Sequence, residues 1–583
     1  MKLARGNRAS LAALAAGLGA SLVAAAGAVR RIGPLLLSDQ DPAWALPRLV
    51  LTVGVIGVAA AAGILAATAM LLWSRSRAAQ LPLEPLPWRG SALAAVAMTA
   101  VAAAAAARFT RLSDVPLALW IEDLTLIDPS LALTGTWRDF ADAIRPAPFG
   151  VARPYGSVGV LYLEAFRACL HAFGTTAFGV RFLSALAGTV SCVTAVLLGR
   201  ALLPRGGGSL AGLALAGLRW SLILSRWGYV AIVLIPLADA AALALLHAKR
   251  RRSAAAALAA GAILGVGAHV YLAAWIVLVA LVLFALWPVE GGAPVSRRVF
   301  LTVALVCGFA AVAAPLFLLR EGRRAPYFAR ARNQSMLRVL RSARSPLPLL
   351  ASAADAVAAP WWLPDPSPWQ DVPKPRLGWL IGIPVAVALG RSLLSPGTEI
   401  SAFLLAHAGA ASAAFVASGP VMQPNGFRFA YLTTVTAIAA AAGLLALAGA
   451  APRKARRSAA LLAVGVLLVS GALSLRAVFF DWAPRLEVLD GFEGHDNLLA
   501  RVALQWECYG RVEIDPALVL WPAGLEAIRR VRRTDLPPGP ATPPGRTFRI
   551  VPSATLPSAG ERAVSRIADE HGAPLALVLA RRS

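Results

Sequence analysis

The chain has 583 residues, of which 58% are hydrophobic and only 15% are charged, and its mean hydropathy is +0.66. This composition excludes an array of soluble domains and indicates a membrane protein with several apolar helical spans. It also excludes an outer-membrane barrel, because the short segments of alternating hydrophobicity that such barrels show are absent. The net charge of +26 does not indicate nucleic-acid binding here, since most Lys and Arg residues stand between apolar runs, where topology and anionic headgroups account for them.

Apolar runs predict about 13 membrane helices in an all-α polytopic fold, because about 20 apolar residues cross one bilayer. The predicted spans are at 9–29, 47–73, 90–107, 178–203, 209–226, 230–248, 253–270, 271–287, 299–319, 377–394, 398–417, 427–450 and 458–476. The first is expected to stay as an anchor, because no convincing cleavage site precedes a soluble domain.

Basic clusters in the short loops orient these helices. Four consecutive cations, Lys249 to Arg252, follow one span, and Arg453 to Arg457 hold four more after another. Such clusters mark the cytoplasmic side, which places both long polar loops, 108–177 and 320–376, on the outer face. The predicted parts are N-terminal helices at 1–89, the main membrane domain at 90–478, and a small extracytoplasmic domain of mixed strands and helix at 479–583.

The first long loop contains a cluster of acids. The stretch VPLALWIEDLTLIDP at 115–129 carries Glu122, Asp123 and Asp128 just past an apolar helix. A carboxylate at the membrane surface can accept the proton of an incoming hydroxyl, and two adjacent acids titrate as a coupled pair. The alternative is a solvated helix start, since acids favour helix N-termini. Spacing alone leaves both open.

Basic and aromatic residues occupy the same predicted face. Arg181, Arg226 and Arg428 lie near the ends of spans, where a guanidinium needs a partner and a phosphate fits its fork. Snorkelling to lipid headgroups is the alternative for each. His269 and Tyr271 stand at an outer turn, where a helix-capping role for the histidine is favoured over phosphate binding or proton relay.

The second long loop is rich in Trp and Pro. Trp361 and Trp369 lie in WWLPDPSPWQDVPKPRLGW. Interfacial tryptophans usually anchor a protein in the membrane, but their rings also stack on sugars. Both roles remain open.

No metal or nucleotide site is readable. The four cysteines, Cys169, Cys192, Cys307 and Cys508, show no CxxC spacing, and Cys192 and Cys307 are expected to be small buried residues within apolar runs. The chain has no GxGxxG, Walker or DxD motif, so a soluble nucleotide-sugar donor has no evident site. We therefore assign no cofactor and no metal ligands, although a divalent metal is not excluded.

Four passages resemble the GT-C superfamily of membrane glycosyltransferases, especially protein O-mannosyltransferases and the lipid A aminoarabinose transferase. They are LWIEDLTLIDPSLAL, FGVRFLSALAGTVSCVTAVLLGRALLP, LILSRWGYVAIVLIPL and GAILGVGAHVYLAAWIVLVALVLFAL. Two weaker matches, PDPSPWQDVPKPRLGWLIG and QPNGFRFAYLTTVTAIAAAAGLL, extend the resemblance over about residues 90–450.

The resemblance implies inverting transfer of a hexosyl or pentosyl group from a polyprenyl-phosphate donor to a protein, lipid or glycan acceptor on the outer face of a bacterial inner membrane. Asp123 or Glu122 would be the base. Arg181, Arg226 and Arg428, with Tyr271 and His269, would bind the donor phosphate. The loop residues Asp128, Trp361 and Trp369 would contact sugar or acceptor.

The sequence departs from the family pattern at three points. The acidic pair is Glu-Asp where the family has Asp-Glu, and Phe182 replaces the usual proline after Arg181. The second long loop lacks the His-Asn signature that many relatives show, which leaves the acceptor side unassigned. The main alternative function is a transporter or flippase for a lipid-linked saccharide, which needs charged groups near mid-span. The predicted charges instead cluster at the outer ends of spans. A non-catalytic scaffold is the second alternative.

Overall fold

The computed structural model describes residues 83–116, 126–133, 160–289, 292–314, 374–418, 426–485, 494–507, 511–519, 546–555, 561–568 and 574–582, with single residues between several of these ranges. The predicted spans at 9–29 and 47–73 lie outside the described residues, and so does Cys508.

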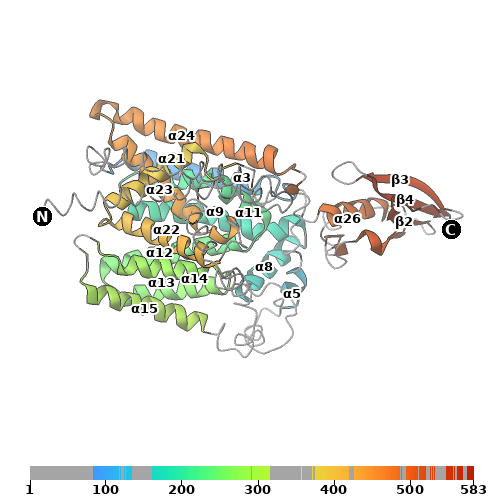
Figure 1. Ribbon diagram of the computed structural model, residues 1–583, viewed down its shortest axis with the longest axis horizontal. Coiled ribbons are helices and arrows are strands. Elements are labelled where there is room, and N and C mark those ends of the chain that lie inside the picture. The colour runs from blue at the N-terminus through green and yellow to red at the C-terminus, as the bar shows by residue number, and fades with distance from the viewer. Residues whose placement is uncertain are drawn as a thin grey trace, which may run out of the picture.

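The described chain is mostly helical, and its long helices run side by side in one bundle (Figure 1). The bundle contains α3 (Gly90–Phe109), α9 (Ala177–Leu202), α10 (Gly207–Ala216), α11 (Arg219–Trp227), α12 (Ala231–Arg251), α13 (Ala254–Ala268), α14 (Ala274–Leu286), α15 (Val295–Ala313), α21 (Trp379–Leu394), α22 (Glu399–Ser418), α23 (Leu432–Gly449) and α24 (Arg456–Arg476).

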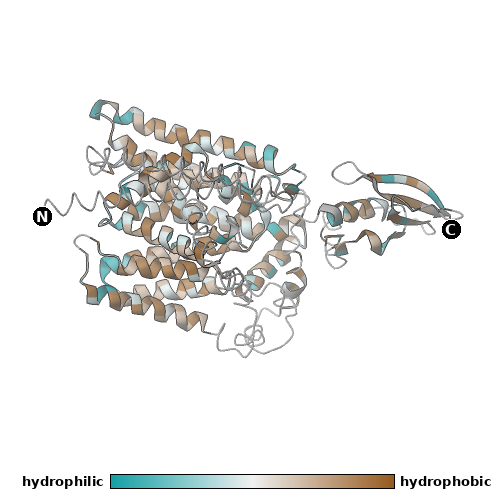
Figure 2. Cartoon of the chain, viewed as in Figure 1, coloured by the Kyte–Doolittle hydropathy of each residue, from teal (hydrophilic) through white to brown (hydrophobic). Residues whose placement is uncertain are grey.

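Seven helices of the described part are long and apolar enough to cross a membrane, or eight if the bent pair α10 and α11 is one span. Three shorter apolar helices, α13, α14 and α21, have 10–17 residues each. Hydrophobic residues predominate along these helices, and hydrophilic ones gather toward several of their ends (Figure 2). The chain is therefore a multi-pass membrane protein.

Except for the span at 209–226, each span predicted in the described ranges corresponds to one helix whose ends agree to within several residues. The prediction at 209–226 is wrong in one respect, because α10 and α11 are two helices that meet at 55°. At the break, a Cβ on Gly217 would lie 2.6 Å from the Cα of Gly471 on α24. The close approach of α24 requires glycine there, and this is a contact that the sequence does not reveal.

Small residues let neighbouring helices touch through their backbones. A Cβ on Gly261 of α13 would lie 1.9 Å from the carbonyl oxygen of Leu305, and one on Gly308 of α15 would lie 2.1 Å from the carbonyl of Leu258. This reciprocal contact is the close packing that small residues permit in membranes.

Two helices of the first long loop lie at one end of the bundle. They are α5 (Ile127–Leu131) and α8 (Val160–Phe173), and the C-terminal domain projects from this same end (Figure 1). We call it the loop end. The basic cluster from Lys249 to Arg252 terminates α12 at the opposite end, which we call the basic end.

The C-terminal domain combines one helix with a small sheet. Helix α26 (Gly494–Glu507) precedes β1 (Arg511–Ile514), β2 (Arg546–Pro552), β3 (Glu561–Ala568) and β4 (Pro574–Arg582). The strand order is β1-β2-β4-β3, with β1 parallel to β2 and the other two pairs antiparallel. Trp506 of α26 packs on Phe548 of β2, their ring centroids 4.9 Å apart. The predicted mixture of strands and helix is confirmed, whereas its extracytoplasmic location remains a prediction.

Candidate functional site

Helix α11 forms the centre of the loop end. All nine of its residues are buried, and an arginine stands near each of its ends. Because a buried guanidinium has five N–H donors to satisfy, its partners show which segments it holds in place. Arg226 holds the first long loop and Arg219 holds the second.

Arg226 binds the chain where it leaves α3. Its nitrogens donate to the carbonyl oxygens of Ala107, Arg108, Thr110, Arg111 and Val115 at 2.7 to 3.2 Å. The last carbonyls of a helix have no partner within it, and a basic side chain can satisfy them. The guanidinium is fully buried and lies over the ring of Phe479, 4.6 Å from its centroid. Arg226 thus caps α3 and fixes the segment that leads to the acidic stretch.

Arg181 at the start of α9 supports the same segment. Its Nη1 donates to the carbonyl of Leu112 at 2.9 Å and to that of Ser113 at 3.3 Å. Both Arg181 and Arg226, predicted as phosphate ligands, are fully buried and directed at backbone carbonyls. Their part in phosphate binding stays a prediction, and the contacts give each a role in holding the loop.

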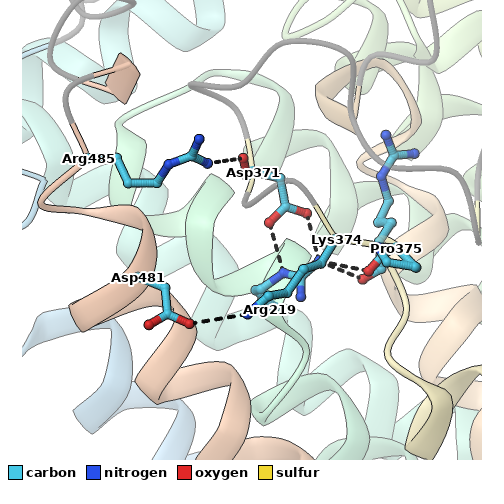
Figure 3. A network of polar contacts seen from close by, with 7 residues as sticks. Arg219, Asp371, Lys374, Pro375, Asp481 and Arg485 are labelled. Carbon is cyan, nitrogen blue, oxygen red and sulfur yellow. Dashed lines mark hydrogen bonds and ion pairs between the residues drawn. The ribbon is translucent and has the colours of Figure 1, made fainter.

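Arg219 binds the second long loop through a two-point ion pair with Asp371 (Figure 3). Its Nε donates to Oδ1 at 2.8 Å and its Nη2 to Oδ2 at 3.2 Å, and Nη2 also donates to the carbonyl of Pro375 at 2.9 Å. The fork geometry matches the carboxylate, and the carbonyl satisfies a further donor. Because both side chains are buried, loss of either one would leave an unpaired buried charge.

The segment after α24 contacts this network from the other side (Figure 3). Arg485 donates to the backbone carbonyl of Asp371 at 3.4 Å. Lys374 forms an ion pair with Asp481 at 3.5 Å. The second loop is therefore held between α11 and the start of the C-terminal region.

A third loop joins the same site through Trp220. The indole N–H of Trp220 donates to the carbonyl of Gly426 at 2.9 Å, and the guanidinium of Arg376 lies 5.0 Å from the centroid of the Trp220 ring. Gly426 begins the 3₁₀ turn η4 (Gly426–Phe429), which contains Arg428. Arg428 is half-buried, in contrast to the fully buried Arg181 and Arg226. Arg428 therefore lies on a turn that is hydrogen-bonded to Trp220 of α11.

The remaining described candidates are Trp361, His269 and Tyr271, and all three are buried. Trp361 is 3% exposed, and its carbonyl accepts a hydrogen bond from the Leu377 amide at 2.9 Å. The Nε2 of His269 lies 2.9 Å from the carbonyl oxygen of Val312, to which it donates in the matching tautomer. Tyr271 meets Tyr229 edge to face, with centroids 6.1 Å apart. His269 thus has a structural contact just after the end of α13, and its part in phosphate binding stays a prediction.

The acidic pair itself is not among the described residues. Glu122, Asp123 and Trp369 lie outside them, as does the side chain of Asp128, whose backbone forms part of α5. The two flanks are described, however. Val115 is bound by Arg226 upstream, and the short helix α5 begins at Ile127 downstream.

Further buried charged residues fall outside the sequence predictions, among them Arg108 and Asp239. Arg108 donates to the hydroxyls of Ser221 and Ser225 at 2.9 and 3.1 Å, and so ties α3 to α11. Asp239 lies midway along α12, where its Oδ2 accepts hydrogen bonds from Thr194 at 2.5 Å and Thr434 at 2.9 Å. The expectation that charges cluster only at span ends is therefore wrong. The sequence does carry a sign of Asp239, which is the single acid in the run AIVLIPLADAAALALL. An ionisable residue inside a span needs polar partners.

Within the described ranges, no group of three or more His, Cys, Asp and Glu residues is placed to hold a metal ion. Cys192 is buried as predicted, but the prediction for Cys307 is wrong, because its side chain is exposed. Cys307 faces outward from α15, and only 22% of the most apolar 18-residue stretch of this helix is buried. An apolar run in a membrane protein can face lipid as well as protein, so it does not predict burial.

A family model described as dolichyl-phosphate-mannose-protein mannosyltransferase matches residues 158–317. The resemblance to membrane glycosyltransferases is confirmed over these residues. The matched segment extends from the start of α8 to just beyond α15 and contains Arg181, Arg219 and Arg226. No curated protein matches the chain.

Solved structures also match. A crystal structure of ArnT from Cupriavidus metallidurans bound to undecaprenyl phosphate is 14% identical, with a TM-score of 0.43, and the match covers 83% of this chain and 97% of that one. The archaeal oligosaccharyltransferase AglB from Archaeoglobus fulgidus, in complex with an inhibitory peptide and a dolichol-phosphate, is 12% identical with a TM-score of 0.45. That match covers 75% of this chain and 63% of AglB.

Proposed function

We propose that this chain is an inverting membrane glycosyltransferase that moves a sugar from a polyprenyl-phosphate carrier to an acceptor on the outer face of a bacterial inner membrane. The observation that carries the proposal is the family match over residues 158–317, since the description of that family names a lipid-phosphate-linked sugar. The geometry of the loop end supports it, because the matched segment supplies the arginines that hold both long loops.

In the proposed reaction, Asp123 or Glu122 takes the proton from an acceptor hydroxyl. The acceptor oxygen attacks the anomeric carbon opposite the carrier, a new carbon–oxygen bond forms, and the bond to the phosphate oxygen breaks. The polyprenyl phosphate leaves with the electron pair, and the anomeric configuration inverts. General-base assistance of this kind contributes about 10²–10⁴-fold in rate.

The arginines divide into two roles in this proposal. Arg181 and Arg226 hold the loop that carries the base, because their nitrogens face backbone carbonyls. Arg428 is half-buried on the turn next to Trp220, and it would bind the phosphate together with Tyr271 and His269. Stabilising the departing phosphate is an electrostatic role that a preformed guanidinium fills well.

A flippase for a lipid-linked saccharide is the second candidate, and Asp239 is the observation that favours it. A buried carboxylic acid within a span marks an ion or substrate pathway in many transporters. Here the carboxyl links three helices, because Thr194 lies on α9 and Thr434 on α23. These contacts equally suit a structural role.

Two assays on the purified protein separate the two functions. Purified protein in lipid nanodiscs receives a panel of radiolabelled polyprenyl-phosphate sugars together with candidate acceptors, and loss of label from the carrier is followed. The transferase proposal predicts that at least one donor is consumed. It fails if folded protein consumes none of them.

The same protein in liposomes is then tested for translocation of a fluorescent lipid-linked saccharide. Translocation that depends on Asp239, lost in Asp239→Asn and kept in a variant of the exposed Asp114, would favour the flippase. Absence of translocation alongside donor consumption would favour the transferase.

A further inference from the structure

A buried side chain of the C-terminal domain contacts the first long loop. Asn497, near the start of α26, is 4% exposed, and Leu119 of the loop is 1% exposed. The backbone N–H of Leu119 donates to Oδ1 of Asn497 at 3.3 Å, and Nδ2 of Asn497 donates to the carbonyl of Leu119 at 3.4 Å. The side-chain amide of Asn497 therefore satisfies both the backbone N–H and the backbone C=O of Leu119.

This contact lies directly before the acidic pair. Leu119 precedes Glu122 by three residues, and three extended residues span at most about 11 Å. On the other side, Arg226 holds the carbonyl of Val115 at 3.2 Å. The chain is thus fixed at two points just upstream of the carboxylates, one from the membrane domain and one from the C-terminal domain.

The same C-terminal region also contacts the second loop. Arg485 donates to the Asp371 carbonyl and Asp481 pairs with Lys374. The region from the end of α24 to α26 therefore fastens both long loops at the loop end, although the domain lies beyond the helical bundle in Figure 1.

We propose that Asn497 is a positioning residue for the acidic stretch, and that the C-terminal domain belongs to the catalytic unit through it. This inference rests on the proposed function, because it takes Glu122 or Asp123 as the base. When a buried backbone N–H and C=O lose their hydrogen-bond partners, the chain must shift until water can bind them. A displacement of about 1 Å at a catalytic group can cost about 10²-fold in rate.

Three variants test the inference. Asn497→Ala removes both hydrogen bonds. Asn497→Asp keeps an oxygen to accept from the Leu119 N–H but turns a second oxygen toward the Leu119 carbonyl, so it serves if the alanine variant does not fold. Gln505→Ala is the matched control, because Gln505 is an exposed residue on the same helix.

The first measurement is hydrogen exchange of the peptides that contain Leu119, in the full-length protein in nanodiscs. We expect exchange about tenfold faster in Asn497→Ala and unchanged in Gln505→Ala. Equal exchange in wild type and both Asn497 variants would overturn the inference. This readout needs no activity, so it stands even if the transferase proposal fails.

The second measurement is steady-state sugar transfer. We expect kcat to fall about 10- to 100-fold in Asn497→Ala, while KM for the donor stays within about twofold, because a uniform binding loss would raise KM instead. Unchanged kcat despite faster exchange would overturn the positioning role. If wild type itself transfers no sugar, the proposed function fails, and hydrogen exchange alone decides whether Asn497 fixes the loop.

Discussion

The loop end and the basic end of the bundle use the same side chain in opposite ways. At the loop end, Arg226, Arg181 and Arg108 are fully buried and donate to backbone or hydroxyl oxygens. At the basic end, Arg251 and Arg252 are exposed. Exposed cations there suit headgroups and topology, whereas burial of an arginine is tolerated only where its donors are satisfied. Arginine burial, rather than the number of arginines, therefore marks the end of the bundle where side chains hold a defined geometry.

The largest effect should come from removing Arg226. Arg226→Ala leaves five backbone carbonyls without this donor, and we expect a loss of about 3–5 kcal/mol in the free energy of unfolding. Arg226→Lys should recover part of it, because an ammonium has three donors and no planar fork. The measurement is thermal aggregation of detergent-purified protein.

The control for Arg226 is Arg250→Ala at the basic end, where the side chain is 48% exposed. An equal loss of thermal stability in the two alanine variants would remove the distinction between the ends.

A double-mutant cycle on two ion pairs gives the next largest effect. Arg219 and Asp371 have side chains that are 10% and 5% exposed, and we expect a coupling energy of about 2–3 kcal/mol. Arg250 and Glu399 form a pair of similar length at the basic end, with side chains 48% and 24% exposed, for which we expect less than about 1 kcal/mol. Stability of the single and double alanine variants measures both. Equal coupling energies for the two ion pairs would contradict this expectation.

Two tryptophans provide a finer test at constant geometry. The indole of Trp220 at the loop end and that of Trp287 at the basic end each donate to a carbonyl at 2.9 Å, and only the first bond is buried. Trp220→Phe should cost about 1–2 kcal/mol, because the Gly426 carbonyl stays buried. Trp287→Phe should cost less than about 0.5 kcal/mol, because water replaces the donor. Thermal shifts in the reverse order would contradict the account.

Within the described ranges, the sequence was sufficient for most of the membrane helices and insufficient for their contacts. Apolar runs placed α9 within one residue at each end, because a membrane span needs a long apolar segment whatever it packs against. The partners of Arg226 were beyond prediction, since its bonded carbonyls lie 111 to 119 residues away along the chain. Arg181 and Arg226 are predicted as phosphate ligands, but a guanidinium suits phosphate and carbonyl oxygens alike, so residue type alone cannot choose between them.

The role of the C-terminal domain also could not be predicted from the sequence. A polar tail with mixed strands and helix was readable from composition, and the sheet β1-β2-β4-β3 agrees. The contact between Asn497 and Leu119 joins residues 378 positions apart, and no local pattern marks either one. Asp239, by contrast, is recognisable in the sequence as an acid within an apolar run.

A catalytic base in the acidic stretch is tested by comparing Glu122→Gln and Asp123→Asn with wild type in sugar transfer from the active polyprenyl-phosphate donor. Asp114→Asn, an exposed acid earlier in the same loop, is the matched control, and thermal stability confirms folding of each variant. We predict that one variant of the pair loses about 10²–10⁴-fold in kcat while Asp114→Asn keeps the wild-type rate. Wild-type rates in both variants of the pair would contradict a catalytic base in the acidic stretch.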